Sequence, residues 1–137
     1  MRIEQLRQRL QALGALPCHE QRVLQSWAQI RSLDTRHRRA VGCAVGCVFC
    51  MTGRDGLLRQ LGSAEIVAQV VLARALRPVK KVVFMGMGEP AHNLENVIEA
   101  IELLGLEGGI GHKNLVFSTV GDYRAFEQLP RAKVVPA

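Results

Sequence analysis

The sequence predicts an α/β fold built around a parallel sheet. Two runs rich in β-branched residues, 79–86 and 115–120, are separated by a segment with helical spacing of apolar side chains. A glycine-rich segment that holds three cysteines, residues 42–56, precedes the first helix of this region. Loops, helices and strands that alternate in this order are typical of parallel sheets with helical crossovers.

Two helices are predicted before the cysteine segment. Apolar residues recur at helical spacing over residues 3–13, and Gly14 marks a plausible end. A second helix is predicted from Pro17 to Leu33, with an apolar side made of Val23, Leu24, Trp27 and Ile30. We therefore expect a helical hairpin over residues 1–33. A polar, basic linker over 34–40 follows it, and residues 41–137 form the core.

The remaining elements follow from caps and breakers. Ser63 is predicted to cap a helix that ends before Pro78. Asn93 is predicted to cap a helix that reaches about Leu104 and is broken at Gly108-Gly109. Beyond the second strand we expect a short helix near 122–129 and a third strand beginning at Val134-Val135.

Composition narrows the class of protein. The chain has 137 residues, enough for one modest domain, and 48% of them are hydrophobic. The formal net charge of +6 favours a polyanionic partner such as RNA. The run Arg36-His37-Arg38-Arg39, taken alone, is more typical of a solvated linker. No apolar run is long enough for a membrane span and no secretory signal is recognised, so we expect a cytoplasmic location.

Three cysteines carry the strongest chemical signal. Cys43, Cys47 and Cys50 have the spacing C-x3-C-x2-C. Three thiolates on one loop can ligate three irons of a 4Fe–4S cluster and leave the fourth iron open to a ligand. Structural zinc would need a fourth protein ligand, for which the candidates are His37 and the more distant Cys18. A plain ferredoxin site would need a fourth cysteine, and none follows the loop. Disulfides fit a reduced cytosolic protein poorly.

Polar clusters follow both predicted strands. The first is Gly86-Met87-Gly88-Glu89-Pro90, and the second is Ser118-Thr119 with Gly121. Ligands gather at the carboxyl ends of parallel strands, although each cluster alone is equally compatible with an ordinary turn or cap. S-adenosylmethionine can chelate an open iron through its amino and carboxylate groups. A carboxylate such as Glu89, or a backbone carbonyl, could then hold that amino group, and Ser118 or Thr119 the ribose or carboxylate. The four histidines are interpreted as surface or capping residues.

These residues together resemble the RlmN/Cfr family of radical S-adenosylmethionine enzymes. The similarity covers residues 41–137 and includes Val41 to Gly53, Gly56 to Leu61, Glu65 to Val70, Val83 to Pro90 and Phe117 to Gly121. Members of that family methylate an adenine carbon, C2 or C8, in ribosomal RNA and in some cases transfer RNA. Their fold is a partial (β/α) barrel with an N-terminal helical extension.

The resemblance implies a role for each matching residue. Cys43, Cys47 and Cys50 would ligate the 4Fe–4S cluster, and Gly88, Glu89 and Ser118 would contact S-adenosylmethionine. It also implies adenine-C2 methylation of ribosomal RNA and possibly transfer RNA, with an electron donor for the cluster. Because no apolar run is long enough to span a membrane, we expect no membrane partner. No catalytic residue is identified in this chain, because the methyl-carrying cysteine of the family has no match among its residues.

The sequence also departs from the family. A strand and an accessory segment that the family has before the cluster loop are missing, and Arg36 stands where the family has a cysteine. We therefore expect an abridged, incomplete barrel with an exposed sheet edge that folds marginally and aggregates or oligomerises. Three hypotheses follow: an RNA methyltransferase, a non-catalytic remnant that binds a cluster or RNA, and a different radical enzyme that needs a partner subunit.

Overall fold

The structure is a computed structural model of the 137-residue chain, and it describes residues 2–12, 17, 20, 21, 24, 28, 41–50, 53, 56–85 and 88–137. The predicted linker at 34–40, with its basic run, lies outside the described residues. So does most of the helix predicted from Pro17 to Leu33, of which five residues are described and are helical.

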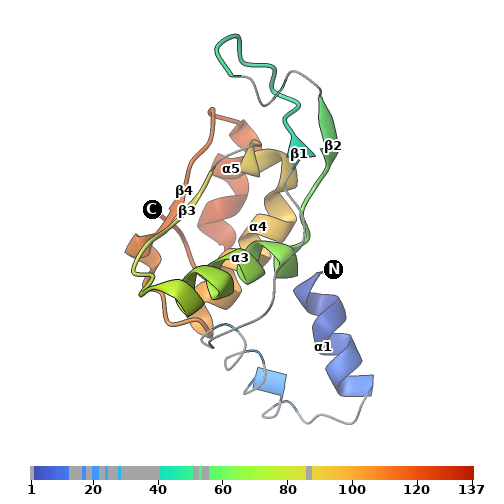
Figure 1. Cartoon of the computed structure of the whole chain (residues 1–137), viewed down its shortest axis with the longest axis vertical. Coiled ribbons are helices and arrows are strands. Elements are labelled where there is room, and N and C mark those ends of the chain that lie inside the picture. The colour runs from blue at the N-terminus through green and yellow to red at the C-terminus, as the bar shows by residue number, and fades with distance from the viewer. Residues whose placement is uncertain are drawn as a thin grey trace.

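A parallel pair of strands lies along one side of the helices (Figure 1). β3 (Val82–Phe84) pairs with β4 (Leu115–Phe117) in the register Val82 to Leu115 and Phe84 to Phe117. α4 (Leu94–Leu106) connects the two strands, and α3 (Ser63–Leu76) precedes them. This β–α–β unit confirms the predicted α/β class, although both strands are shorter than the β-branched runs that predicted them.

The chain end adds to this sheet. The Ala137 amide donates to the carbonyl of Leu115 at 2.8 Å, and the Phe117 amide donates to the carbonyl of Ala137 at 2.9 Å. Ala137 therefore bonds to the edge of β4 that faces away from β3. The third strand expected to begin at Val134-Val135 is not among the strands of the described residues, and Ala137 alone makes these bonds to β4. α5 (Tyr123–Gln128) occupies the predicted short-helix position.

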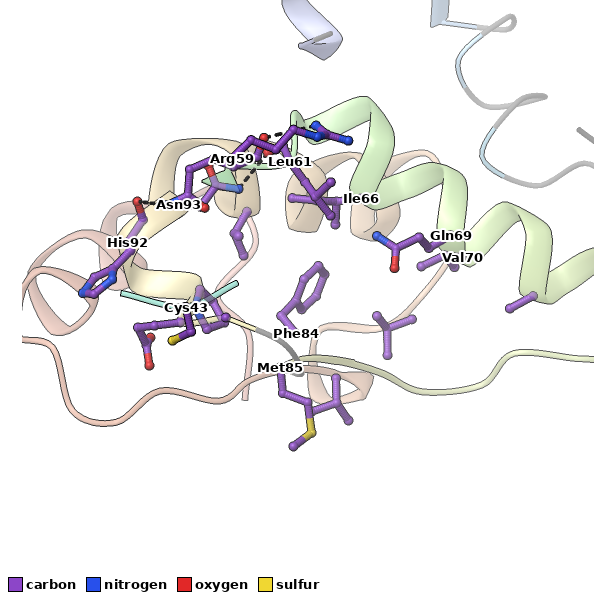
Figure 2. Close-up of a pocket in the computed structure, with 18 of the residues that line it drawn as sticks. Cys43, Arg59, Leu61, Ile66, Gln69, Val70, Phe84, Met85, His92 and Asn93 are labelled. Atoms are coloured by element: carbon purple, nitrogen blue, oxygen red, sulfur yellow. Dashed lines mark hydrogen bonds between the residues drawn. The ribbon is translucent and has the colours of Figure 1, made fainter. Parts of the chain in front are cut away.

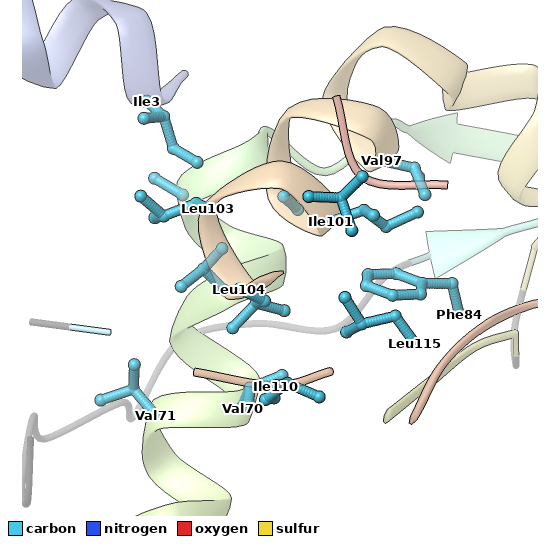
Figure 3. Packing of buried hydrophobic residues seen from close by; sticks show 14 of the residues in the cluster. Ile3, Val70, Val71, Phe84, Val97, Ile101, Leu103, Leu104, Ile110 and Leu115 are labelled. Atoms are coloured by element: carbon cyan, nitrogen blue, oxygen red, sulfur yellow. The ribbon is translucent and has the colours of Figure 1, made fainter. Parts of the chain in front are cut away.

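The hydrophobic core lies between α3, α4 and the sheet (Figure 3). Apolar residues at helical spacing on α3 and α4 meet β4, because each helix carries one apolar face. The largest fully buried apolar side chains in this layer are Val67, Val71, Ile101, Leu104 and Leu115. Gly105 lies close to Val134, since an added Cβ would be 2.9 Å from a Val134 methyl.

The structure corrects one predicted helix cap and confirms the position of the other. Gly62, not Ser63, is the N-cap of α3, and its amide donates to the Glu65 carboxylate at 2.9 Å. Ser63 is fully buried and accepts a hydrogen bond from the Ile3 amide at 2.8 Å. Asn93 precedes α4 but makes no side-chain cap bond. It donates instead to the Leu61 carbonyl at 2.7 Å, because the chain before α3 passes beside it.

The N-terminal helix packs on the core. α1 (Ile3–Ala12) places Ile3 in the same apolar cluster as α3 and α4. The buried Glu20 accepts hydrogen bonds from Arg7 and Gln11, and those bonds, that from Gln11 foremost, lower its pKa. Arg74 of α3 donates to the carbonyls of Ala28 and Gly108 at 2.6 and 2.8 Å. The division of the chain into a helical hairpin, a linker and a core, with boundaries at residues 33 and 40, stays a prediction.

Candidate functional site: a cysteine loop at the end of a parallel sheet

The cysteine loop begins at a short antiparallel hairpin that sequence patterns did not predict. β1 (Val41–Gly42) pairs with β2 (Leu57–Arg59), and the loop between them projects from one end of the molecule (Figure 1). Gly46 has a φ of +68°, a conformation that favours glycine. Gly53 lies against the loop's start, where an added Cβ would be 3.3 Å from the Cys43 carbonyl oxygen. These two glycines let the loop fold back on itself.

The three cysteines differ in exposure. Cys43 and Cys47 are half-buried and Cys50 is exposed. The Cys43 sulfur accepts the Val45 amide at 3.4 Å, and the Cys50 amide donates to the Cys47 carbonyl at 3.0 Å. Val48 and Phe49 are exposed at 104% and 91%. The tip of the loop is therefore open to solvent.

The loop offers the right donors for a metal cluster but does not draw them together. Among the described residues, no three His, Cys, Asp or Glu side chains are grouped closely enough to hold a metal ion. The donor set itself, three cysteine sulfurs within eight residues, fits a 4Fe–4S cluster with one open iron. The Cys43 sulfur accepts a backbone N–H, and hydrogen bonds of this kind help to set the reduction potential of iron–sulfur clusters.

Glu89 ties the ends of the two strands together. Its side chain is buried, with Oε1 accepting the Ala91 amide and Oε2 accepting the Val120 amide, both at 2.9 Å. Ala91 lies in the 3-10 turn Pro90–Asn93 that follows β3, and Val120 follows β4. A carboxylate has roughly four acceptor positions, so both oxygens retain acceptor capacity.

The other predicted cofactor residues lie at the same sheet end. Gly88 directly precedes Glu89 and has a φ of +150°, which residues with side chains rarely adopt. The Ser118 amide donates to the Phe84 carbonyl at 3.1 Å and so extends the pairing of β3 with β4. Gly86 and Met87 lie outside the described residues. Gly88, Glu89 and Ser118 are thus brought together by the parallel pairing.

A cavity of about 580 Å³ connects the cysteine loop with this sheet end (Figure 2). Cys43, Gly88 and Glu89 contribute to its wall, together with His92 and Asn93, whereas Ser118 is not among its lining residues. Its volume falls within the range of small-molecule sites, roughly 300–1,000 Å³. Cys43 and Glu89, which are 46 positions apart in the sequence, therefore line the same cavity.

An ionic cluster beside the cavity was not predicted. His92 Nε2 lies 3.7 Å from Asp122 Oδ2, and Arg124 donates to both oxygens of that carboxylate. The Arg124 guanidinium is the main reason why the pKa of Asp122 falls to about 2. Asp122 is also the N-cap of α5, where it accepts the Arg124 amide at 3.0 Å. The cap was readable from the sequence, but its closeness to His92 depends on the fold.

The comparisons with known proteins agree with this fold and site. The family model described as the radical SAM superfamily matches residues 38–135. The chain therefore belongs to the radical SAM superfamily. A crystal structure of a radical SAM methyltransferase from Sphaerobacter thermophilus matches with a TM-score of 0.75 at 24% identity, over 99% of this chain and 60% of that one. This structural match confirms the incomplete radical SAM fold.

Similar sequences carry a more specific name. A probable RNA methyltransferase from Azoarcus sp. (strain BH72) is 54% identical over 200 residues, which take in 100% of this chain and 58% of that protein. Another from Stutzerimonas stutzeri (strain A1501) is 84% identical over 97 residues, 71% of this chain and 28% of that protein. The chain thus spans a little over half the length of the Azoarcus relative.

Proposed function

We propose that this chain supplies the cluster-binding and cofactor-binding part of a radical S-adenosylmethionine RNA methyltransferase. The observation that carries the proposal is the shared cavity, in which Cys43 of the cysteine loop lies together with Gly88 and Glu89 at the end of β3. Parallel α/β sheets bind ligands at this end. A metal donor and a buried carboxylate in one cavity are what a chelating, amino-bearing cofactor needs.

In this proposal Cys43, Cys47 and Cys50 hold a 4Fe–4S cluster. When bound, such a cluster supplies the electron that cleaves the carbon–sulfur bond of S-adenosylmethionine. The loop that carries the three cysteines is bent at two points, by the turn between Cys47 and Cys50 and by the positive φ of Gly46. Closure of the loop toward the cavity would cover Val48 and Phe49, which are otherwise exposed apolar side chains.

Gly88, Glu89 and Ser118 contact the cofactor in this proposal. The Glu89 carboxylate is fixed by two backbone amides, so it can accept from the cofactor's amino group without first being ordered. Gly88 has no side chain to obstruct close approach to the backbone. Ser118 lies where the backbone passes from β4 to the loop containing Val120, and its hydroxyl is suited to the ribose or carboxylate.

The proposed reaction is methylation of adenine C2 in ribosomal RNA, and in transfer RNA, as in RlmN. The name of the relatives, probable RNA methyltransferase, supports an RNA substrate. The net charge of +6 supports a polyanionic partner. We propose a cytoplasmic location and an electron donor for the cluster. In the described part of the chain, no helix is both long and apolar enough to cross a membrane.

A second candidate is a non-catalytic remnant that binds a cluster or RNA. The observation in its favour is the cysteine count. Apart from the three loop cysteines the chain contains only Cys18, so no residue matches the methyl-carrying cysteine expected from the family. The two candidates differ in whether bound S-adenosylmethionine is cleaved.

The test is an anaerobic assay of the iron-loaded chain with S-adenosylmethionine, a reductant and ribosomal RNA. We expect release of 5′-deoxyadenosine by the original chain and by Cys18→Ala, none by Cys47→Ala, and no methyladenine in the RNA. Methyladenine formed by the chain alone would contradict its assignment as a part of the enzyme. A loaded cluster without 5′-deoxyadenosine would favour the remnant, as would RNA binding that Cys47→Ala leaves unchanged.

A further inference from the structure

The cavity continues away from the cysteine loop as a groove between α3 and β3. One wall is a stripe along α3 with helical spacing, and the other is the chain that leads into and along β3. We call this part of the cavity the strand groove; it is lined by Ile66, Val70, Ala73, Arg77, Val79, Lys81 and Val82. Figure 2 shows Ile66 and Val70 on α3 facing the space above Phe84 and Met85. Most of the lining is apolar.

The groove runs beside an open sheet edge. Among the described strands β3 pairs only with β4, on one side. The Phe84 carbonyl accepts the Ser118 amide, so it points toward β4. Backbone groups alternate in direction along a strand, and therefore the N–H and C=O of Val83 point to the opposite edge. An edge with free backbone groups and neighbouring pockets is a template for another strand.

The alignment with the Azoarcus relative indicates what is missing here. It runs over 200 positions and includes all 137 residues, which leaves about 63 positions of that relative without a counterpart. Those positions belong to the aligned stretch itself. The relative therefore has additional chain inside the stretch that aligns with this one. An open edge with an apolar groove is where additional chain can join a sheet.

Charge defines one end of the groove. Arg77 and Lys81 line it where the chain enters β3, and neither has an ion-pair partner among the described residues. Glu65, by contrast, is paired with Arg59 at the other end of α3. An occupant with apolar side chains along α3 and a carboxylate near Arg77 and Lys81 would match both properties of the groove.

We propose that the strand groove accepts a β-strand from a second polypeptide, a segment equivalent to part of the relative's additional positions. That segment is extended and mainly β-branched, pairs with the Val83 edge of β3, and carries an acidic residue that meets Arg77 and Lys81. The inference is independent of the proposed methyl transfer, because it requires neither a cluster nor S-adenosylmethionine.

The probe is a set of overlapping 15-residue synthetic peptides, about 15 residues being enough for any one strand. Together they cover the roughly 63 additional positions of the Azoarcus relative. Binding to the cluster-free chain is measured by fluorescence anisotropy, with thermal unfolding as a second readout. We expect one peptide to bind saturably and to raise the unfolding temperature. Failure of every peptide to bind would overturn the proposal.

Two matched variants test whether the peptide binds in the strand groove. Ala73→Trp fills the groove, whereas Ala75→Trp adds the same side chain to α3 at an exposed position that does not line it. We expect at least tenfold weaker binding for Ala73→Trp and unchanged binding for Ala75→Trp, both checked for folding by circular dichroism. Equal binding by the two variants would contradict the assigned groove.

Reversing the charge of Lys81 tests the proposal without adding a bulky side chain to the groove. Lys81→Glu should weaken binding of the natural peptide, and a peptide whose acidic residue is changed to lysine should restore it. If binding is not restored, the proposed contact between an acidic residue of the peptide and Lys81 is wrong. If the chain instead forms a dimer that Ala73→Trp dissociates, a second copy occupies the groove, and the proposed occupant is wrong.

Discussion

The β–α–β core and the cysteine loop are stabilised by different interactions. In the core, Ile101, Leu104 and Leu115 are 0% exposed and pack against one another and α3. In the loop, Val48 and Phe49 are almost fully exposed, and the three sulfurs are not drawn together. Burial of apolar surface determines the core conformation. None of the described loop residues is buried, so we expect the functional conformation of the loop to depend on a bound ligand.

Glu89 joins the two regions. Its carboxylate is fixed by backbone amides that follow β3 and β4, and its side chain also contributes to the cavity that Cys43 lines. A defect in the core should therefore reach the sheet end of the cavity, whereas a defect in the loop should leave the core intact. The predictions below test this asymmetry, in order of their expected effect on stability.

Ile101→Ala should produce the largest loss. Ile101 is fully buried at the centre of the core, and removal of such a side chain costs about 2–5 kcal/mol. The measurement is urea unfolding of the cluster-free chain, with Leu106→Ala, an exposed residue on the same helix, as the control. A loss below about 1 kcal/mol would indicate that the core is loosely packed.

Glu89→Ala should have an intermediate effect. It leaves the buried Ala91 amide and the part-buried Val120 amide without their acceptor, which costs about 1–3 kcal/mol for a buried group and less for one that water can reach. Glu95→Ala is the matched control, because that side chain is 78% exposed. Hydrogen exchange should accelerate at Val120 in the first variant only. Equal exchange in both would show that Glu89 does not hold the two strand ends together.

Asp122 should give a small, pH-dependent effect. Its pKa is lowered from 3.8 to about 2, chiefly by Arg124, so the folded state favours the ionised carboxylate. The resulting stabilisation is complete above about pH 4 and is lost as the pH falls through about 2. Asp122→Asn should therefore flatten the pH dependence of unfolding in this window. If the stability of Asp122→Asn falls with decreasing pH as steeply as that of the original chain, the contact between Asp122 and Arg124 does not stabilise the fold.

Cys47→Ala should have the smallest effect on the cluster-free chain. The loop contributes little packing, so the free energy of unfolding should change by less than about 0.5 kcal/mol. Iron binding after anaerobic loading should nevertheless be lost. A clear destabilisation without iron would mean that the loop is part of the core, and retained iron would remove Cys47 from the ligand set.

The two regions also differed in how far the sequence predicted them. Periodicity and breakers predicted α3, α4 and both strands, because apolar faces determine those elements locally. The cap at Ser63 was wrong, because its hydroxyl accepts the distant Ile3 amide. Asn93 does hold the predicted N-cap position of α4, but its side chain bonds to the Leu61 carbonyl and makes no cap bond. The spacing of Cys43, Cys47 and Cys50 predicted the donor set, but the cavity that joins Cys43 to Glu89 required the fold.

Neither the His92–Asp122 contact nor the identity of the strand with the open edge, β3, could be predicted from residue spacing alone. Both depend on which segments lie side by side, and the spacing of residues in one chain does not specify that. The exposed sheet edge was expected only because the resemblance indicated a missing strand. Its groove and its basic end come from the way α3 lies beside β3.

The central claim is that the cysteine loop and the end of the parallel sheet form one site. Electron paramagnetic resonance of the anaerobically iron-loaded, reduced chain, with and without S-adenosylmethionine, tests it most directly. The account predicts a 4Fe–4S signal that changes when the cofactor is added, and that no longer changes in Glu89→Ala. A cluster signal indifferent to the cofactor, or no cluster at all, would contradict it.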